Sequence, residues 1–241
     1  MLLALDTSTR YAGVAIADEE RVMATHSWHS TYNHTTELMP AVAQILGHVG
    51  LTASDLGGVA VALGPGGFSA LRVGISAAKG LALVSKNPIV GVSSLDLEAF
   101  PYLESGSQVC ALIEAGREEC ATALFGQDGT RIREDRVCGV AELLTEITDP
   151  TIFCGEGVTA WRTEITAGMG SNALIVEPVP SNRVWALAVI GRRKLAAGET
   201  GDLTTMQPEY LRMPSIGAPK QRDRVPQGGR AARRPIPKPA R

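Results

Sequence analysis

The chain has 241 residues, of which 44% are hydrophobic and 20% are charged, and its formal net charge is −2. This length and composition are typical of a soluble globular protein with one large or two small domains. No apolar run reaches the length of a bilayer span, and the start of the chain lacks a basic signal-peptide pattern. We therefore expect a cytoplasmic protein that makes no membrane contact.

The cysteines indicate neither a disulfide framework nor a zinc site. The chain has four of them, and no two form a Cys-x-x-Cys pair. We predict that they are buried free thiols in strands: Cys110, Cys120, Cys138 and Cys154.

The first part of the chain reads as a three-strand meander. An apolar strand from Leu2 ends in Asp6-Thr7-Ser8, and further strands are predicted over residues 12–17 and 21–27. A carboxylate and two hydroxyls in the first connection suit a hydrated metal or a nucleotide phosphate, but the same residues also cap ordinary turns. They are therefore weak candidates for nucleotide binding.

Two helices follow, and the second is unusual. Residues 34–48 form the first, with Asn33 as the expected N-cap. A buried strand over residues 58–63 then enters Gly64-Pro65-Gly66-Gly67, a turn that suits close backbone approach, before a helix over residues 69–84. This second helix carries small residues that reduce intrinsic helix stability, by roughly 1 kcal/mol for each glycine. We expect a partner to pack closely against it.

The second half repeats the order of the first. Strands are predicted over 108–114, 118–125 and 130–137, followed by helices and short strands in alternation to a long helix over 182–198, with Asn182 as its expected N-cap. We predict an N-terminal domain over residues 1–102 and a reduced C-terminal domain over 103–214. This duplicated α/β order, with mixed sheets, resembles the actin-like ATPase (ASKHA) architecture.

The last segment has a different composition. Residues 215–241 contain eight basic residues against one acidic residue, and five prolines. Such a segment cannot form a core, and we expect a disordered basic tail. Contact with RNA phosphates and a merely solubilising role remain equally open.

Common catalytic motifs do not occur. The glycine turn does not fit the phosphate-loop pattern, and neither a Gly-x-Ser-x-Gly elbow nor a His-Glu-x-x-His pattern is present. Asp6, Glu114 and Glu156 all lie at the ends of predicted strands, near turns, but their spacing does not select a catalytic pair. The residues alone therefore name no catalytic or metal-ligating group.

Several segments together closely resemble the TsaB family, the bacterial partner subunits in the synthesis of threonylcarbamoyladenosine in tRNA. The most specific is the block from Gly64 to Gly74, and the resemblance extends to about Arg212. The other segments are Asp6-Thr7-Ser8, Asn33-His34 with Leu38-Met39-Pro40, Ala78-Lys79-Gly80-Leu81-Ala82, Gly91-Val92-Ser93-Ser94-Leu95, Glu114-Ala115-Gly116-Arg117 and Pro208-Glu209-Tyr210-Leu211-Arg212.

The resemblance implies a subunit that has lost catalytic function. The catalytic paralogue, TsaD, carries a His-x-x-x-His metal motif, and the corresponding residues here are Ser94 and Glu98. Serine is a poor metal ligand, so this site lacks both imidazoles. We expect no metal and no resident cofactor, with ATP possible only at the level of the complex. An actin-like ATPase or small-molecule kinase is the alternative function, and a metalloprotease-like peptidase is a weaker one.

The resemblance also implies the partners. We expect binding to TsaD, with the ATPase subunit TsaE and tRNA in the complex, and a possible homodimer. The family pairs through helices of the N-terminal domain, which correspond to the two helices described above. The expected interface residues are His34, Leu38, Met39, Ala70, Arg72, Val73, Gly74, Ser76, Ala77 and Lys79.

Overall fold

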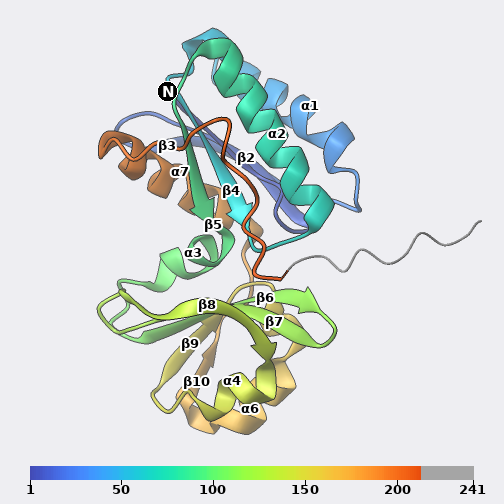
Figure 1. Cartoon of the computed structure of the whole chain (residues 1–241). Coiled ribbons are helices and arrows are strands. Elements are labelled where there is room, and N and C mark those ends of the chain that lie inside the picture. The colour runs from blue at the N-terminus through green and yellow to red at the C-terminus, as the bar shows by residue number, and fades with distance from the viewer. Residues whose placement is uncertain (213–241) are drawn as a thin grey trace, which may run out of the picture.

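The computed structural model describes residues 1–212, so the predicted basic tail lies outside the described residues. Figure 1 shows two sheets, each with its own helices. The strands are β1 (Leu2–Asp6), β2 (Tyr11–Ala17), β3 (Val22–His29), β4 (Gly58–Gly64), β5 (Ile89–Ser93), β6 (Gln108–Gly116), β7 (Glu119–Phe125), β8 (Arg131–Gly139), β9 (Thr151–Cys154) and β10 (Ala173–Ile175). The α-helices are α1 (His34–His48), α2 (Phe68–Ser85), α3 (Ser94–Ala99), α4 (Val140–Thr145), α5 (Gly157–Ala160), α6 (Arg162–Met169) and α7 (Pro180–Ala196).

The two sheets have the same topology. The first has the order β3-β2-β1-β4-β5, and the second, read in the matching direction, has the order β8-β7-β6-β9-β10. In each sheet the first three strands are antiparallel and the last two continue in parallel. The predicted duplication of a three-strand meander followed by alternating helices and strands is therefore confirmed.

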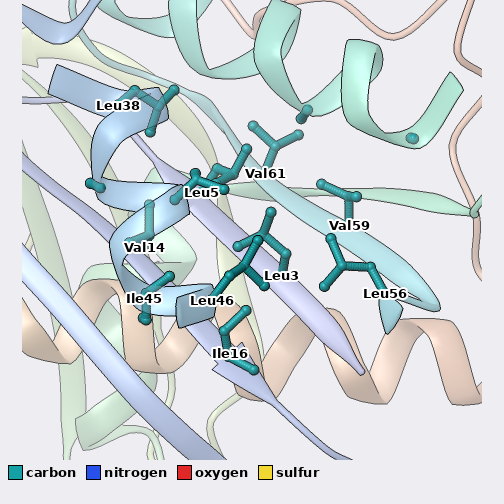
Figure 2. Close-up of a cluster of buried hydrophobic side chains, with 14 of the residues drawn as sticks. Leu3, Leu5, Val14, Ile16, Leu38, Ile45, Leu46, Leu56, Val59 and Val61 are labelled. Atoms are coloured by element: carbon teal, nitrogen blue, oxygen red, sulfur yellow. The ribbon is translucent and has the colours of Figure 1, made fainter. Parts of the chain in front are cut away.

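Helices cover both faces of the first sheet. Leu3, Leu5 and Val61 point to one face, where they pack with Leu38 and Ile45 of α1 and with the inner side of α2 (Figure 2). Alternate strand residues point to the other face, because successive side chains of a strand alternate, and α7 covers them with its own apolar residues.

The position of α7 differs from the predicted division of the chain. A boundary after residue 102 agrees with the last turn before the second sheet, but it assigns α7 to the second domain. The helix instead packs on β1, β2 and β4 of the first sheet, where Val184 and Leu187 are fully buried. The N-terminal unit therefore contains residues from both ends of the described chain.

Of the two predicted N-caps, one is confirmed in position and the other needs correction. Asn33 precedes α1 as expected, but its side chain makes no capping hydrogen bond. Asn182 is not an N-cap, because α7 begins two residues earlier at Pro180, whose fixed φ angle suits the first turn of a helix.

The cysteine prediction is confirmed, since all four thiols are free, buried and placed on β6, β7, β8 and β9. Burial raises the pKa of the Cys110 thiol to about 12.

Helix α2 is long and apolar enough, by length and composition alone, to cross a membrane, contrary to the expectation that no apolar run has that length. Among the described helices it alone meets this criterion. It lies on β4 beside α1, as helices of α/β domains do, yet only five of its 18 residues are buried. Its outer side is therefore unusually apolar for a surface helix.

Candidate functional site

The Asp6-Thr7-Ser8 segment lies at the end of β1 with all three residues buried. Asp6 Oδ1 accepts hydrogen bonds from Ser8 N at 2.9 Å and from Ser8 Oγ at 2.6 Å. The Thr7 hydroxyl donates to the carbonyl of Ala70 in α2 at 2.6 Å. The polar groups proposed for a nucleotide thus bond within the chain.

The other oxygen of Asp6 is bound to Arg183, a residue of α7 that is only 3% exposed. Its Nε donates to Asp6 Oδ2 at 2.9 Å, and its Nη2 donates to Ser8 Oγ at 2.5 Å. Its Nη1 donates to Glu98 of α3. The guanidinium group therefore joins the first sheet to the helix that precedes the second sheet.

The charges of this cluster are strongly coupled. Burial opposes the charge of Arg183, but the carboxylates of Asp6, Glu98 and Glu156 outweigh burial and raise its pKa. Burial also raises the pKa of Glu98 and of Glu156, although Arg183 acts in the opposite direction on both. The sequence singled out Asp6 and Glu156 as strand-end carboxylates. In the structure Asp6 binds Arg183 directly, and Glu156 lies near enough for its charge to act on the pKa of Arg183.

Sequence reasoning missed Arg183 itself. The available signal was an arginine beside Val184 and four residues before Leu187, on a helix whose periodic residues are apolar. A charged residue on the buried side of such a helix indicates a buried ion pair. Its acceptors, however, are 177 and 85 residues away in the chain, at Asp6 and Glu98.

The positions that match the paralogue's metal ligands do not fit a metal ion. Ser94 is fully buried and its hydroxyl has no partner among the described residues. Glu98 lies against Arg183, whose fixed positive charge opposes a cation at the same carboxylate. Within residues 1–212, no group of three or more His, Cys, Asp or Glu side chains is arranged to hold a metal.

The Gly64-Pro65-Gly66-Gly67 turn packs onto the end of β1. The amide of Gly67 donates to the carbonyl of Ser8 at 2.7 Å, and a side chain on Gly66 would overlap that carbonyl. Gly64 has φ +116, a conformation that favours glycine. The close backbone approach that the sequence predicts for this turn is therefore confirmed, and the partner is the segment that follows β1.

A cleft of about 620 Å³ lies between the two sheets. The first domain contributes Ser8 to Tyr11, the start of α1 and the start of α2, and the second domain contributes Glu114, Gly116 and Glu156. Of the expected interface residues, His34, Ala70 and Val73 line this cleft.

The expected interface residues fall into three groups by exposure. Leu38 and Gly74 are buried inside their own domain, and His34 is only 7% exposed. Ala70, Val73, Ala77 and Lys79 are half-buried, while Met39, Arg72 and Ser76 are exposed. Leu38 and Gly74 therefore cannot offer surface to a partner in this conformation, because the core and Thr7 already cover them.

The Pro208–Arg212 segment joins the two domains. The amide of Glu209 donates to the carbonyl of Leu63 at 2.8 Å, and the ring of Tyr210 stacks on Phe68 with 5.2 Å between centroids. Arg72 lies over the other ring of this pair, 3.9 Å from the Phe68 centroid, and Arg212 binds Glu119 of β7. The final described residues thus contact α2 and the second sheet at once.

We expect Tyr210→Ala to lower the free energy of unfolding by about 1–2 kcal/mol, because stacked aromatic pairs contribute about 0.5–1.5 kcal/mol beyond the area they bury. Tyr210→Phe is the matched control, since it keeps the ring and removes only the 3.3 Å contact from Arg72 Nε to the hydroxyl. Urea unfolding measures both variants. Equal losses of unfolding free energy for the two variants would show that the hydroxyl of Tyr210, and not its ring stack on Phe68, stabilises the fold.

The architecture identifies a class of protein. Two α/β domains of shared strand order, with a cleft between them, form an actin-like ATPase fold. The solved structure of the activator of the 2-hydroxyisocaproyl-CoA dehydratase from Clostridium difficile, with bound ADPNP, has a TM-score of 0.50 at 10% identity and covers 83% of this chain and 97% of its own. At that identity the similarity concerns the fold alone.

The sequence relatives identify the family. The TsaB tRNA threonylcarbamoyladenosine biosynthesis protein of Bacillus subtilis is 30% identical over 88% of this chain and 94% of its own length. The solved structure of YeaZ from Pseudomonas aeruginosa has a TM-score of 0.70 at 26% identity, covering 87% of this chain and 98% of that one. The model of the TsaD family, tRNA N6-adenosine threonylcarbamoyltransferase, matches residues 28–171. The chain therefore belongs to the TsaB family of tRNA threonylcarbamoyladenosine biosynthesis proteins, related to the TsaD transferases.

Proposed function

We propose that the chain is a non-catalytic subunit that binds and supports the catalytic paralogue TsaD when threonylcarbamoyl is transferred to the adenosine beside the anticodon. The observation that carries the proposal is the position of Arg183. Its guanidinium binds Asp6, which the sequence offered as a weak nucleotide candidate, and Glu98, one of the two positions that correspond to the metal-binding histidines of TsaD. A buried cation of the chain itself thus engages both of these carboxylates, which supports a non-catalytic role.

The alternative functions need groups that are engaged elsewhere. An actin-like ATPase or small-molecule kinase would use Asp6 as a free carboxylate, but Asp6 Oδ1 and Oδ2 accept hydrogen bonds from Ser8 and Arg183 respectively. A metalloprotease-like peptidase would need metal ligands where Ser94 and Glu98 stand. Both alternatives therefore have less support than the subunit function.

We expect no turnover of ATP by the isolated chain, measured as phosphate release at saturating ATP and Mg²⁺. The physical reason is that Asp6, the carboxylate a kinase would use, is bound by Ser8 and Arg183 and is not free to act on a nucleophile. Phosphate release that is lost in an Asp6→Asn variant of intact fold would contradict the proposal and favour the kinase.

The surface proposed for the paralogue is the outer side of α1 and α2. We define the α1–α2 outer face by its exposed residues Met39, Ala43, Arg72, Ser76, Gly80 and Leu83. Met39 is 46% exposed and Leu83 is 68% exposed, and Val84 beside them is 86% exposed. Apolar side chains with small residues between them allow close packing of a partner helix. This face includes Met39, Arg72 and Ser76 of the predicted interface residues. It leaves out Leu38 and Gly74, which are buried in their own domain.

The remaining partners follow from family membership and are part of the same proposal. The ATPase subunit TsaE and a tRNA substrate would join the complex, which acts in the cytoplasm. ATP would be used by the complex and not by this chain. In the absence of the paralogue, the α1–α2 outer face could pair with a second copy of itself as a homodimer.

A further inference from the structure

One arginine of the α1–α2 outer face has a fixed side chain but no carboxylate beside it. Arg72 is exposed on α2 and follows Phe68 by four residues, so both lie on the same side of the helix. Its guanidinium lies 3.9 Å from the Phe68 centroid, and its Nε donates to the Tyr210 hydroxyl at 3.3 Å. Within residues 1–212 these are the contacts of the guanidinium, and none of them is an ion pair.

The groups that hold Arg72 are themselves held. The ring of Tyr210 stacks on Phe68 with 5.2 Å between centroids and 28° between planes, and the neighbouring Glu209 amide donates to the Leu63 carbonyl at 2.8 Å. A free surface arginine loses rotamer freedom when it enters an interface, and this loss opposes binding. Arg72 has already lost part of that freedom in the isolated chain, so it is preorganised for a contact.

The part of the guanidinium that remains free determines what Arg72 can bind. Tyr210 occupies the Nε donor, whereas Nη1 and Nη2 have no acceptor among the described residues. Two N–H groups of a planar guanidinium match the two oxygens of a carboxylate and can donate to both. The free edge therefore suits an Asp or Glu side chain on a partner.

The charges of the two helices favour the same partner group. Arg72 and Lys79 are the charged residues of α2, which contains no Asp or Glu. The one carboxylate of α1 is Glu37, whose Oε2 accepts a hydrogen bond from the Trp28 indole at 2.9 Å. A face with positive charge and no adjacent free carboxylate attracts an acidic partner surface and disfavours a second cationic one.

We propose that Arg72 is the charged specificity determinant of the α1–α2 outer face, that it pairs through Nη1 and Nη2 with a carboxylate of TsaD, and that Tyr210 is the positioning residue that holds it. This inference rests on the proposed function, because it uses the same face. It adds the chemical group that the face recognises, and it gives the Pro208–Arg212 segment a part in recognition. Exposed apolar residues such as Met39 and Leu83 add contact area but do not select a partner by charge.

The first test is titration calorimetry of the full chain with TsaD at low and at high salt. Arg72→Glu reverses the charge, and Arg72→Lys keeps the charge but removes the planar pair of donors. Arg193→Glu and Arg193→Lys are the matched controls, because Arg193 is also exposed and also lies over a phenylalanine ring, that of Phe100. Arg193 belongs to α7, which covers the other face of the first sheet.

We expect affinity to fall at least about tenfold in Arg72→Glu and about three- to tenfold in Arg72→Lys, with less than about a twofold change in either control. The losses should be smaller at high salt, because salt screens the ion pair. Unchanged affinity in Arg72→Glu, while the wild-type chain binds TsaD, would overturn this inference and leave the proposed function intact. Absence of binding by the wild-type chain would overturn both.

A double-mutant cycle tests the positioning function of Tyr210. Tyr210→Phe keeps the stacked ring and removes the hydroxyl that binds Arg72. We expect it to lower TsaD affinity about threefold in the wild-type chain and not at all in Arg72→Ala, because the two residues act as one unit. An equal loss in both backgrounds would show that Tyr210 acts only through the fold, which would overturn its positioning function.

Sedimentation of the isolated chain separates TsaD from a second copy of the chain as the partner of Arg72. We expect Arg72→Glu to leave the self-association of the chain unchanged. Reduced self-association with unchanged TsaD affinity would assign Arg72 to a homodimer and overturn the proposal.

Discussion

Arg183→Met is expected to lower the free energy of unfolding by about 3–5 kcal/mol, because it leaves buried carboxylates without their cation. Asp6 and Glu98 are 1% and 7% exposed, so water cannot replace the guanidinium unless the cluster opens. Methionine has a similar length and no polar atom that needs a partner, which limits the cavity term. Urea unfolding at pH 7, followed by circular dichroism, measures the loss.

Arg193→Met is the matched control for that prediction. Arg193 lies on the same helix, but it is exposed and its guanidinium stacks 5.3 Å from the centroid of Phe100. Exposed cation–π contacts contribute about 0.5–1 kcal/mol, so this variant should lose no more than about 1 kcal/mol. Similar losses for the two variants would show that the buried cluster of Arg183, Asp6 and Glu98 does not stabilise the fold more than an exposed arginine does.

Gly80→Leu is expected to reduce association with TsaD at least tenfold while slightly stabilising the isolated chain. Gly80 is exposed in the middle of α2, and a side chain built there meets nothing within 4 Å. Leucine is a better helix former by up to about 1 kcal/mol, so the fold does not suffer. Added bulk on a closely packed helix face, by contrast, prevents the partner from approaching. Titration calorimetry with the paralogue measures the affinity, and thermal unfolding measures the stability.

Ala167→Leu controls for added surface hydrophobicity. Ala167 is exposed on α6, which packs against the second sheet and not against α1 or α2. This variant should bind the paralogue as tightly as the wild-type chain. Gly80→Leu with unchanged affinity would place the interface elsewhere. Gly74→Leu cannot serve as the test, because a Cβ at Gly74 would lie 2.5 Å from the Thr7 hydroxyl and the variant would disturb the fold itself.

Local sequence patterns predicted most of the fold. The alternation of short apolar runs with helical periodicity predicted both meanders and the parallel strands that follow them, because each strand has a local turn or cap signal. The same patterns could not assign α7 to a sheet. Its periodicity indicates that one side of the helix is buried. It does not indicate that this side packs on β1 and β2, which lie far earlier in the chain.

The candidate site was only partly predictable for a similar reason. Asp6 and Glu156 stand out at strand ends, whereas Arg183 reaches Asp6 only through the return of α7 to the first sheet. On α2, Gly74 and Gly80 look equivalent in sequence, since both are glycines in a helix of small residues. The fold distinguishes them, because Gly74 faces Thr7 and Gly80 faces outward. Which side of such a helix meets a partner cannot be read from composition alone.

The most direct test of the account is the amount of threonylcarbamoyladenosine formed in tRNA by a reconstituted system. The components are the threonylcarbamoyl adenylate donor, tRNA, TsaD, TsaE with ATP, and this chain, each omitted in turn. The account predicts product only when TsaD and this chain are both present, and far less product when Gly80→Leu replaces the wild-type chain. Product formed by this chain in the absence of TsaD, or an equal amount formed by TsaD without this chain, would contradict it.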